Sequence, residues 1–150
     1  MNVALSPDEL ARACADAMWK EDDASQGLGM KIVEIKPGQA TLTMTVEPHM
    51  VNGQRIAHGG FIFLLADSTF AFACNSHNER AVAAQCHVTF IRPGKLGDVL
   101  VASAREISRS GRSGIYDVQV TANGVVIAEF RGHSRTIPGT WLPVADTDKT

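Results

Sequence analysis

The chain has 150 residues, of which 45% are hydrophobic and 20% are charged, a composition typical of one globular domain spanning residues 1–150. Fourteen Lys and Arg side chains against 16 Asp and Glu give a formal net charge of −2, so we expect no nucleic-acid partner and no attraction to an anionic membrane. The longest apolar run, residues 61–66, is far shorter than the roughly 20 residues that a membrane span needs.

The three cysteines, Cys14, Cys74 and Cys86, are widely spaced and form no C-x-x-C pair. An odd number at this spacing argues against a disulfide framework and favours reduced thiols, which predicts a cytoplasmic protein. We expect Cys74 and Cys86 to lie in apolar surroundings and to be inert packing residues. The histidines form no H-E-x-x-H or Cys/His pairing, and we expect neither a metal nor a cofactor.

Residues 7–20 are predicted to form a helix. Ser6 offers an N-cap oxygen, Pro7 suits the first helical position, and Glu9 stands three residues after the cap. Apolar residues then recur at the spacing of one helical face. The polar residues 21–26 are expected to link this helix to the next element.

Two strands are predicted next, over residues 30–36 and 41–46. In the second one, Leu42, Met44 and Val46 alternate with threonines, which predicts one face toward a core and one toward solvent. Four more strands, separated by short turns, are predicted over residues 81–91, 97–108, 114–122 and 125–136. Short turns favour antiparallel pairing.

A long apolar segment, residues 61–74, lies between the two groups of strands. It is apolar on all sides, and its length favours a helix that other elements surround. The predicted fold is therefore α+β, with a curved antiparallel β-sheet wrapped around a long central α-helix. The polar residues 139–150 are expected to form a loosely held tail.

Asp67 is the charged residue of this predicted helix. Aspartate is disfavoured in the middle of a helix, and a buried carboxylate without partners costs several kcal/mol. Either the helix has a solvated stripe that includes Asp67, Ser68 and Asn75, or the carboxylate serves a function. The dense apolar run before Asp67 favours a function.

Gly59 and Gly60 stand where a loop becomes this helix, directly after His58. Their N–H groups suit a developing oxyanion, because the helix dipole adds positive potential there, although two glycines also permit a tight turn and nothing more. Eight residues separate Gly59 from Asp67, about 12 Å along a helix. If both act on one carbonyl, they come from different chains, and we infer a site shared across a two-fold interface.

A motif of eight residues surrounds these positions: Asn52, Gly53, His58, Gly59, Gly60, Leu64, Ala66 and Asp67. With it, and with the run from Phe90 to Gly94, the chain resembles the hot-dog-fold acyl-CoA thioesterases of the phenylacetic acid degradation type, the PaaI-type family. The resemblance covers about residues 16–138 and implies a hot-dog fold. It also implies hydrolysis of an acyl-CoA, of phenylacetyl-CoA or hydroxyphenylacetyl-CoA type, without a cofactor.

The resemblance implies a role for each motif residue. The Gly59 N–H would polarise the thioester carbonyl, and Asp67 of the neighbouring subunit would be the nucleophile or the general base. Asn52 and His58 would orient the thioester and the attacking water. The assembly implied is a homodimer with shared active sites, two of which form a homotetramer.

Coenzyme A needs positive charge and open N–H groups for its phosphates. We expect it to contact Gly60 and Arg92, together with Arg109, Gly111 and Arg112 in a serine- and glycine-rich turn. An ordinary hairpin turn with solvated arginines has the same composition.

The chain departs from the family at one place. Many members have Ser or Thr on the strand after the central helix, near the water, whereas this chain has Ala84 and Gln85. Either Gln85 substitutes for the missing hydroxyl, or the polar group is dispensable. Two other functions stay open: a hot-dog enoyl-CoA hydratase or dehydratase, and a non-catalytic acyl-CoA-binding protein.

Overall fold

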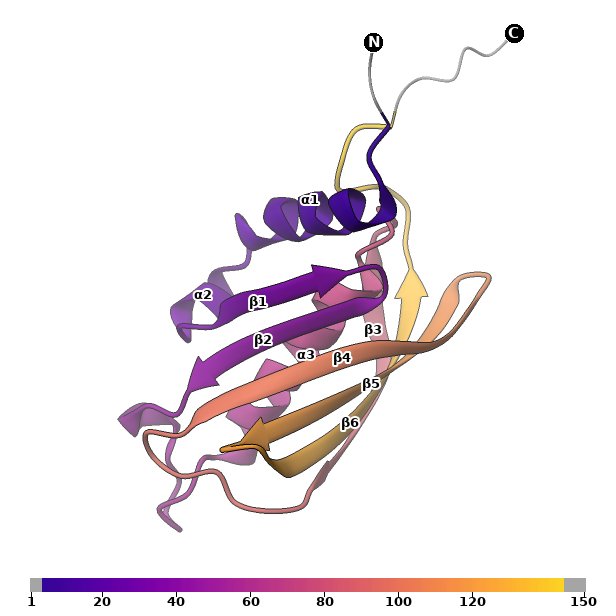
Figure 1. Cartoon of the computed structure of the whole chain (residues 1–150). Helices are drawn as coiled ribbons and strands as arrows, with labels where there is room; N and C mark the ends of the chain where they lie inside the picture. The colour runs from indigo at the N-terminus through magenta and orange to yellow at the C-terminus, as the bar shows by residue number, and fades with distance from the viewer. Residues whose placement is uncertain (1–3, 145–150) are drawn as a thin grey trace, which may run out of the picture.

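The protein is described by a computed structural model over residues 4–144. Its elements in chain order are α1 (Pro7–Trp19), α2 (Asp23–Gly27), β1 (Lys31–Lys36), β2 (Gln39–Thr45), a 3-10 turn η1 (Pro48–Met50), α3 (Gly59–Cys74), β3 (Ala81–Phe90), β4 (Val99–Ser110), β5 (Ser113–Ala122) and β6 (Val125–Thr136). Figure 1 shows a curved sheet that wraps around α3. The predicted α+β fold is confirmed, and the sheet does not close into a barrel.

The six strands form one antiparallel sheet in the order β1-β2-β4-β5-β6-β3. Hairpins join β4 to β5 and β5 to β6, as the short turns predict. In the second hairpin Asn123 and Gly124 both have positive φ angles, 51° and 76°, which a tight hairpin turn requires. Strand β3 instead crosses to the far side and pairs with β6, so β1 and β3 are the two edges.

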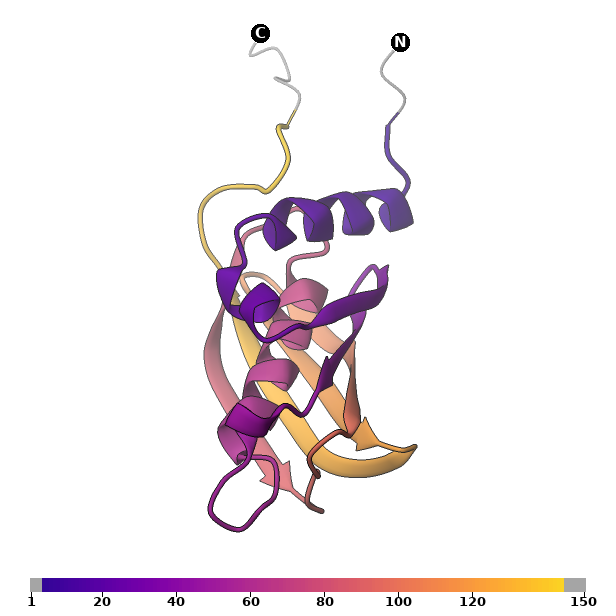
Figure 2. The same ribbon diagram turned by 90° about the vertical axis from the view of Figure 1, so that its left-hand side faces the viewer.

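The core lies between α3 and the concave face of the sheet (Figure 2). Leu42 and Met44 of β2 are at most 1% exposed, which confirms the alternation predicted for that strand. Phe70 of α3 packs directly against the backbone of Gly132 in β6. A side chain at position 132 would not fit, because its Cβ would lie 2.8 Å from the Phe70 ring. Helix and sheet therefore approach closely at this point of α3.

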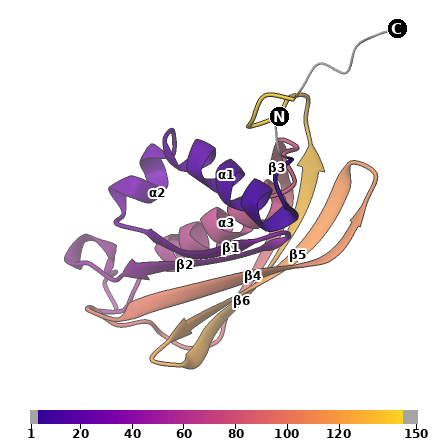
Figure 3. The same ribbon diagram turned by 45° about the horizontal axis from the view of Figure 1, so that its top comes forward.

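Helices α1 and α2 lie on the same side of the sheet as α3 (Figure 3). The cap of α1 forms as predicted, with the Glu9 N–H donating to Ser6 Oγ at 3.1 Å. The polar link contains the short helix α2, whose Ser25 hydroxyl bonds to the Ser68 hydroxyl of α3 at 2.8 Å. Within residues 4–144, no helix has the length and apolar character of a membrane-spanning segment.

The first part of the predicted tail is held in place. Trp141 donates from Nε1 to Asn75 Oδ1 at 2.8 Å, and its backbone N–H donates to Asn78 Oδ1 at 3.0 Å. The Arg80 guanidinium lies 3.9 Å from the centre of the Trp141 ring. The expectation of a loose tail is therefore wrong for residues 139–142, because polar groups of the α3–β3 connection bind them; residues 145–150 lie outside the described part of the chain.

We expect the Trp141→Ala substitution to lower the free energy of unfolding by about 1–3 kcal/mol, because it removes one hydrogen bond and the stacking of Arg80. The Trp141→Phe substitution keeps the ring and removes the donor, and should cost about 1 kcal/mol. Urea unfolding of both variants measures these changes. Wild-type stability in Trp141→Ala would contradict the assignment of residues 139–142 as an anchored segment.

Candidate active site

The start of α3 leaves one backbone donor without an acceptor. His58 is the N-cap, and its Nδ1 accepts from the Gly60 N–H at 2.9 Å, which places the ring proton on Nε2. The Phe61 N–H donates to the His58 carbonyl at 3.0 Å. The Gly59 N–H makes no hydrogen bond within residues 4–144, and it lies at the positive end of the helix dipole.

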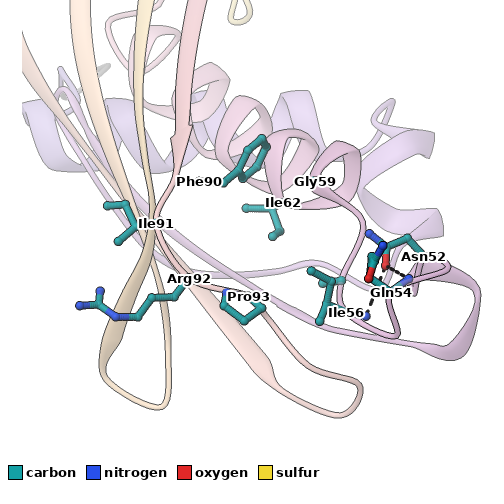
Figure 4. A pocket seen from close by; sticks show the side chains of 10 residues that line it. Asn52, Gln54, Ile56, Gly59, Ile62, Phe90, Ile91, Arg92 and Pro93 are labelled. Carbon is teal, nitrogen blue, oxygen red and sulfur yellow. Dashed lines mark hydrogen bonds between the residues drawn. The ribbon is translucent and has the colours of Figure 1, made fainter.

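A cavity of about 660 Å³ opens beside this donor (Figure 4). It is lined by Asn52, Gln54, Ile56, Ala57, Gly59, Ile62, Phe90, Ile91, Arg92 and Pro93. Most of these side chains are apolar, and the polar ones come from the loop before α3 and from the residue after Ile91. The cavity therefore combines an apolar wall with a few donors, as small-molecule sites do.

The loop that carries Asn52 is tied to its surroundings. Asn52 Oδ1 accepts from the Gln54 N–H at 2.9 Å and from the Ile56 N–H at 3.4 Å. The Ala57 N–H donates to the Gly94 carbonyl at 2.8 Å. Because Oδ1 is used by the loop, the amide nitrogen of Asn52 is the group of this side chain that remains for a ligand at the cavity.

Asp67 lies two turns further along α3, half-buried and outside the cavity lining. Within residues 4–144, its carboxylate has one contact of hydrogen-bond type, a thiol contact in which Cys86 Sγ lies 4.0 Å from Oδ1. Burial raises the pKa of the Asp67 carboxyl above its ordinary value. A carboxylate with a raised pKa is a stronger base than an ordinary aspartate.

The two cysteines beside Asp67 remain protonated. Burial is the main cause that raises the pKa of Cys74 to about 12, with the charge of Asp67 as the next. Burial, followed by the same charge, also raises the pKa of Cys86. High thiol pKa values fit the prediction that both are unreactive, because the thiolate is the reactive form.

A bulge in β3 decides which residue faces Asp67. The pairing with β6 shifts between Ala83 and Gln85, so Ala84 is an extra residue in the strand. Gln85 consequently lines a surface groove together with His133, and Cys86 on the other face of β3 lies next to Asp67. Within one chain, Gln85 therefore lies on the face of β3 that points away from Asp67.

The structure separates the arginines expected to bind coenzyme A. Arg92 lies at the cavity, where its Nη1 donates to the Val126 carbonyl at 2.8 Å. Arg109, Gly111 and Arg112 lie at the β4–β5 turn, the other end of a strand about 35–40 Å long. Arg112 Nη2 donates to the Thr136 carbonyl at 3.0 Å. Within one chain these residues do not form a common surface with Arg92.

Comparison with known proteins gives the family. Residues 54–128 match the model of the Thioesterase superfamily. Over 127 residues the chain is 42% identical to the acyl-coenzyme A thioesterase PaaI of Escherichia coli, covering 84% of this chain and 91% of that protein. The chain belongs to the thioesterase superfamily, in its PaaI-type branch.

Two further similarities agree with this family assignment. The solved structure of the Escherichia coli PaaI protein superposes with a TM-score of 0.89 at 40% identity, covering 90% of this chain and 99% of that chain. Human acyl-coenzyme A thioesterase 13 is 30% identical over 125 residues, covering 80% of this chain and 89% of that protein. The family's hot-dog fold, expected from the sequence motif, is thereby confirmed.

The raised pKa of Asp67 leads to a prediction about stability. Asp67→Asn removes a carboxylate that burial disfavours, so we expect a higher free energy of unfolding at pH 7. Between the unfolded and the raised folded pKa of Asp67 the folded carboxyl binds more protons, so the destabilisation caused by Asp67 shrinks as the pH falls through this window. Urea unfolding of the wild type and of Asp67→Asn tests this at pH 7 and at pH 3.8, the ordinary pKa of an aspartate. The gain in the free energy of unfolding of Asp67→Asn over the wild type should be smaller at pH 3.8. An equal gain at both pH values would contradict it.

Proposed function

We propose that the protein hydrolyses acyl-CoA thioesters to a free acid and coenzyme A, with phenylacetyl-CoA and its hydroxylated form as the first substrates to test. The observation that carries the proposal is the Gly59 N–H at the start of α3, which has no acceptor within residues 4–144 and belongs to a residue that lines a mostly apolar cavity. Membership of the PaaI-type thioesterases supports it.

The thioester carbonyl oxygen accepts from the Gly59 N–H, with the amide nitrogen of Asn52 as the second donor. Such a donor strengthens as charge develops on the oxygen, and one donor is worth about 10²–10³ in rate. His58 acts by holding the Gly60 N–H, which keeps the helix start in shape. This arrangement stabilises the tetrahedral intermediate.

Asp67 supplies the attacking oxygen, either directly or through a water that it deprotonates. In the water route, the new C–O bond forms between the water oxygen and the carbonyl carbon, the C–S bond breaks, and the proton that Asp67 took from the water passes to the coenzyme A thiolate. In the direct route, the C–O bond joins Asp67 to the acyl group as a mixed anhydride, the C–S bond breaks, and a water then hydrolyses the anhydride to the free acid and supplies the proton for the thiolate. The raised pKa of Asp67 brings its proton affinity toward that of a base at neutral pH.

Two copies of the chain build each site. Strand β3 is an edge whose residues are mostly exposed, and α3 has a half-buried stripe formed by Phe63, Leu64, Asp67 and Ser68. Antiparallel pairing of two β3 edges about a two-fold axis would cover both surfaces. It would bring Asp67 of the partner subunit toward Gly59, from which Asp67 of the same chain is about 12 Å away.

The same pairing accounts for the separated arginines. In an antiparallel pair, the Ala81 end of one β3 lies beside the Phe90 end of the other. The β4–β5 turn, with Arg109 and Arg112, is at the Ala81 end of the sheet, because Gly114 pairs with Ser134 and Ser134 pairs with Ala83. A turn from one subunit would then stand near Arg92 of the other, where the phosphates of coenzyme A would bind.

Two further properties belong to this proposal. Two such dimers would form a tetramer, which light scattering measures. The three free cysteines and a coenzyme A ester as substrate fit a reducing, cytoplasmic compartment.

Replacing the carboxylate should abolish turnover without unfolding the protein. We expect Asp67→Ala and Asp67→Asn to lower kcat by at least about 10²-fold. In the wild type, kcat/KM should fall as the pH drops through the raised Asp67 pKa, so the acid limb lies above pH 3.8. Thiol release from a panel of acyl-CoA esters measures both effects.

Asp16→Asn, which changes an exposed carboxylate of α1, is the matched control and should keep wild-type rates. Full activity of Asp67→Ala would overturn the proposal. A change in enoyl absorbance without thiol release would assign a hydratase, and binding without turnover would assign an acyl-CoA-binding protein.

Mixed dimers test whether the site is shared. Gly59→Pro removes the donor and adds a Cβ that meets the Phe90 ring, while the proline φ angle suits the first helical position after a residue with extended backbone such as His58. Asp67→Ala and Gly59→Pro should each be inactive, but a mixed dimer holds one site with both residues intact. We expect co-refolding of equal amounts to restore about a quarter of the wild-type activity. Activity no higher than that of the separate variants would contradict sharing.

A further inference from the structure

Phe90 is held rigidly at the end of β3, beside the start of α3. Its Cα pairs with that of Ala128, and the next two residues, Ile91 and Arg92, both donate their N–H groups to the Ile127 carbonyl, at 2.8 and 3.2 Å. The side chain is 50% exposed and lines the cavity. Because the backbone on both sides of Phe90 is hydrogen-bonded, the Cα atom that carries the ring is held in place.

The tip of the Phe90 ring lies against Gly59. A Cβ at position 59 would lie 2.8 Å from Cζ of the ring and 3.2 and 3.3 Å from the two Cε atoms. Carbon atoms in ordinary contact are about 3.5–4.0 Å apart, so no methyl group fits between the ring and the helix start. Figure 4 shows Phe90 beside Gly59 and Ile62, with Ile56 and Pro93 across the cavity.

This geometry restricts any acyl group whose carbonyl binds at Gly59. A carbonyl oxygen at the usual distance of about 2.9 Å from the nitrogen brings its carbon about 1.2 Å further into the cavity. Because the Phe90 ring stands next to Gly59, we expect the atom bonded next to that carbon to lie alongside the ring. A substituent on that atom points either at the ring or at the opposite wall.

We propose that Phe90 is a specificity-determining residue: its ring is the wall that limits branching at the carbon next to the thioester carbonyl. The inference rests on the proposed thioesterase function and goes beyond it, because it names the side chain that selects the shape of the acyl group. The absence of a side chain at Gly59 lets the Phe90 ring lie against the start of α3.

A pair of substrates that differ by one methyl group tests the wall. The pair is the unbranched acyl-CoA that the wild type cleaves fastest and its counterpart with a methyl group on the carbon next to the carbonyl; for phenylacetyl-CoA this is 2-phenylpropanoyl-CoA. One methyl group in an apolar pocket changes kcat/KM by about 10-fold or more. We expect Phe90→Ala to raise the ratio of branched to unbranched kcat/KM by about tenfold over the wild type.

Val125→Ala is the control, because Val125 is 48% exposed at the start of β6 and lies outside the cavity lining. Its ratio should equal that of the wild type. An unchanged ratio in Phe90→Ala, or an equal rise in Val125→Ala, would overturn the assignment of Phe90.

A second test uses the contact with Gly59. Gly59→Ala keeps the N–H but adds the methyl group that meets the ring, so we expect this variant to lose activity. The double variant Gly59→Ala/Phe90→Ala should have a kcat/KM at least about tenfold higher than Gly59→Ala alone. Gly59→Pro lacks the N–H, and the added Phe90→Ala should not restore it. Equal rescue of both Gly59 variants, or of neither, would overturn the steric coupling.

The two proposals fail in different ways. If the wild type releases thiol from no acyl-CoA, the proposed function is wrong. If the wild type is active but the Phe90 variants leave the branching ratio and the Gly59→Ala loss unchanged, the function stands and the role of Phe90 is wrong.

Discussion

The site depends on how the backbone donors at the start of α3 are satisfied. His58 takes the Gly60 N–H with its side chain, and the hydrogen bond from Ala57 to the Gly94 carbonyl fixes the loop that leads into the helix. One donor, the Gly59 N–H, remains at the positive end of the helix dipole. An N–H group at a helix start that no group of the described chain accepts is available to a ligand oxygen in the cavity. The helix start is thus prepared for a carbonyl before any substrate binds.

A second unsatisfied group lies on the same helix. Asp67 interrupts a stripe of α3 that the sheet does not cover, and burial penalises its charge without an ion pair in the described chain. The fixed helical rise keeps Asp67 and Gly59 of one chain apart. The incomplete surface of α3 and the exposed edge β3 both find their partners in a second copy of the chain, which links dimerisation with catalysis in the proposed function.

Much of the fold followed from sequence-local chemistry. The cap at Ser6, the alternation in β2 and the turn at Asn123 each act within a few residues, so their effects were visible in the sequence. The short helix α2 has a local cap, in which the Ser25 N–H donates to Asp22 Oδ1, but its packing on α3 was not visible, because that contact joins Ser25 to Ser68 across 43 positions. The anchoring of residues 139–142 was missed for the same reason, since its acceptors lie more than 60 positions away.

For the site, the sequence by itself determined the donor, the carboxylate and their separation along one helix, because the helical rise is the same wherever the helix packs. Only the tertiary structure decided that Phe90 stands against Gly59, that the bulge in β3 turns Cys86 and not Gln85 toward Asp67, and that Arg109 lies far from the cavity. These outcomes depend on strand register and on which strands become neighbours, and both are set by packing between distant segments.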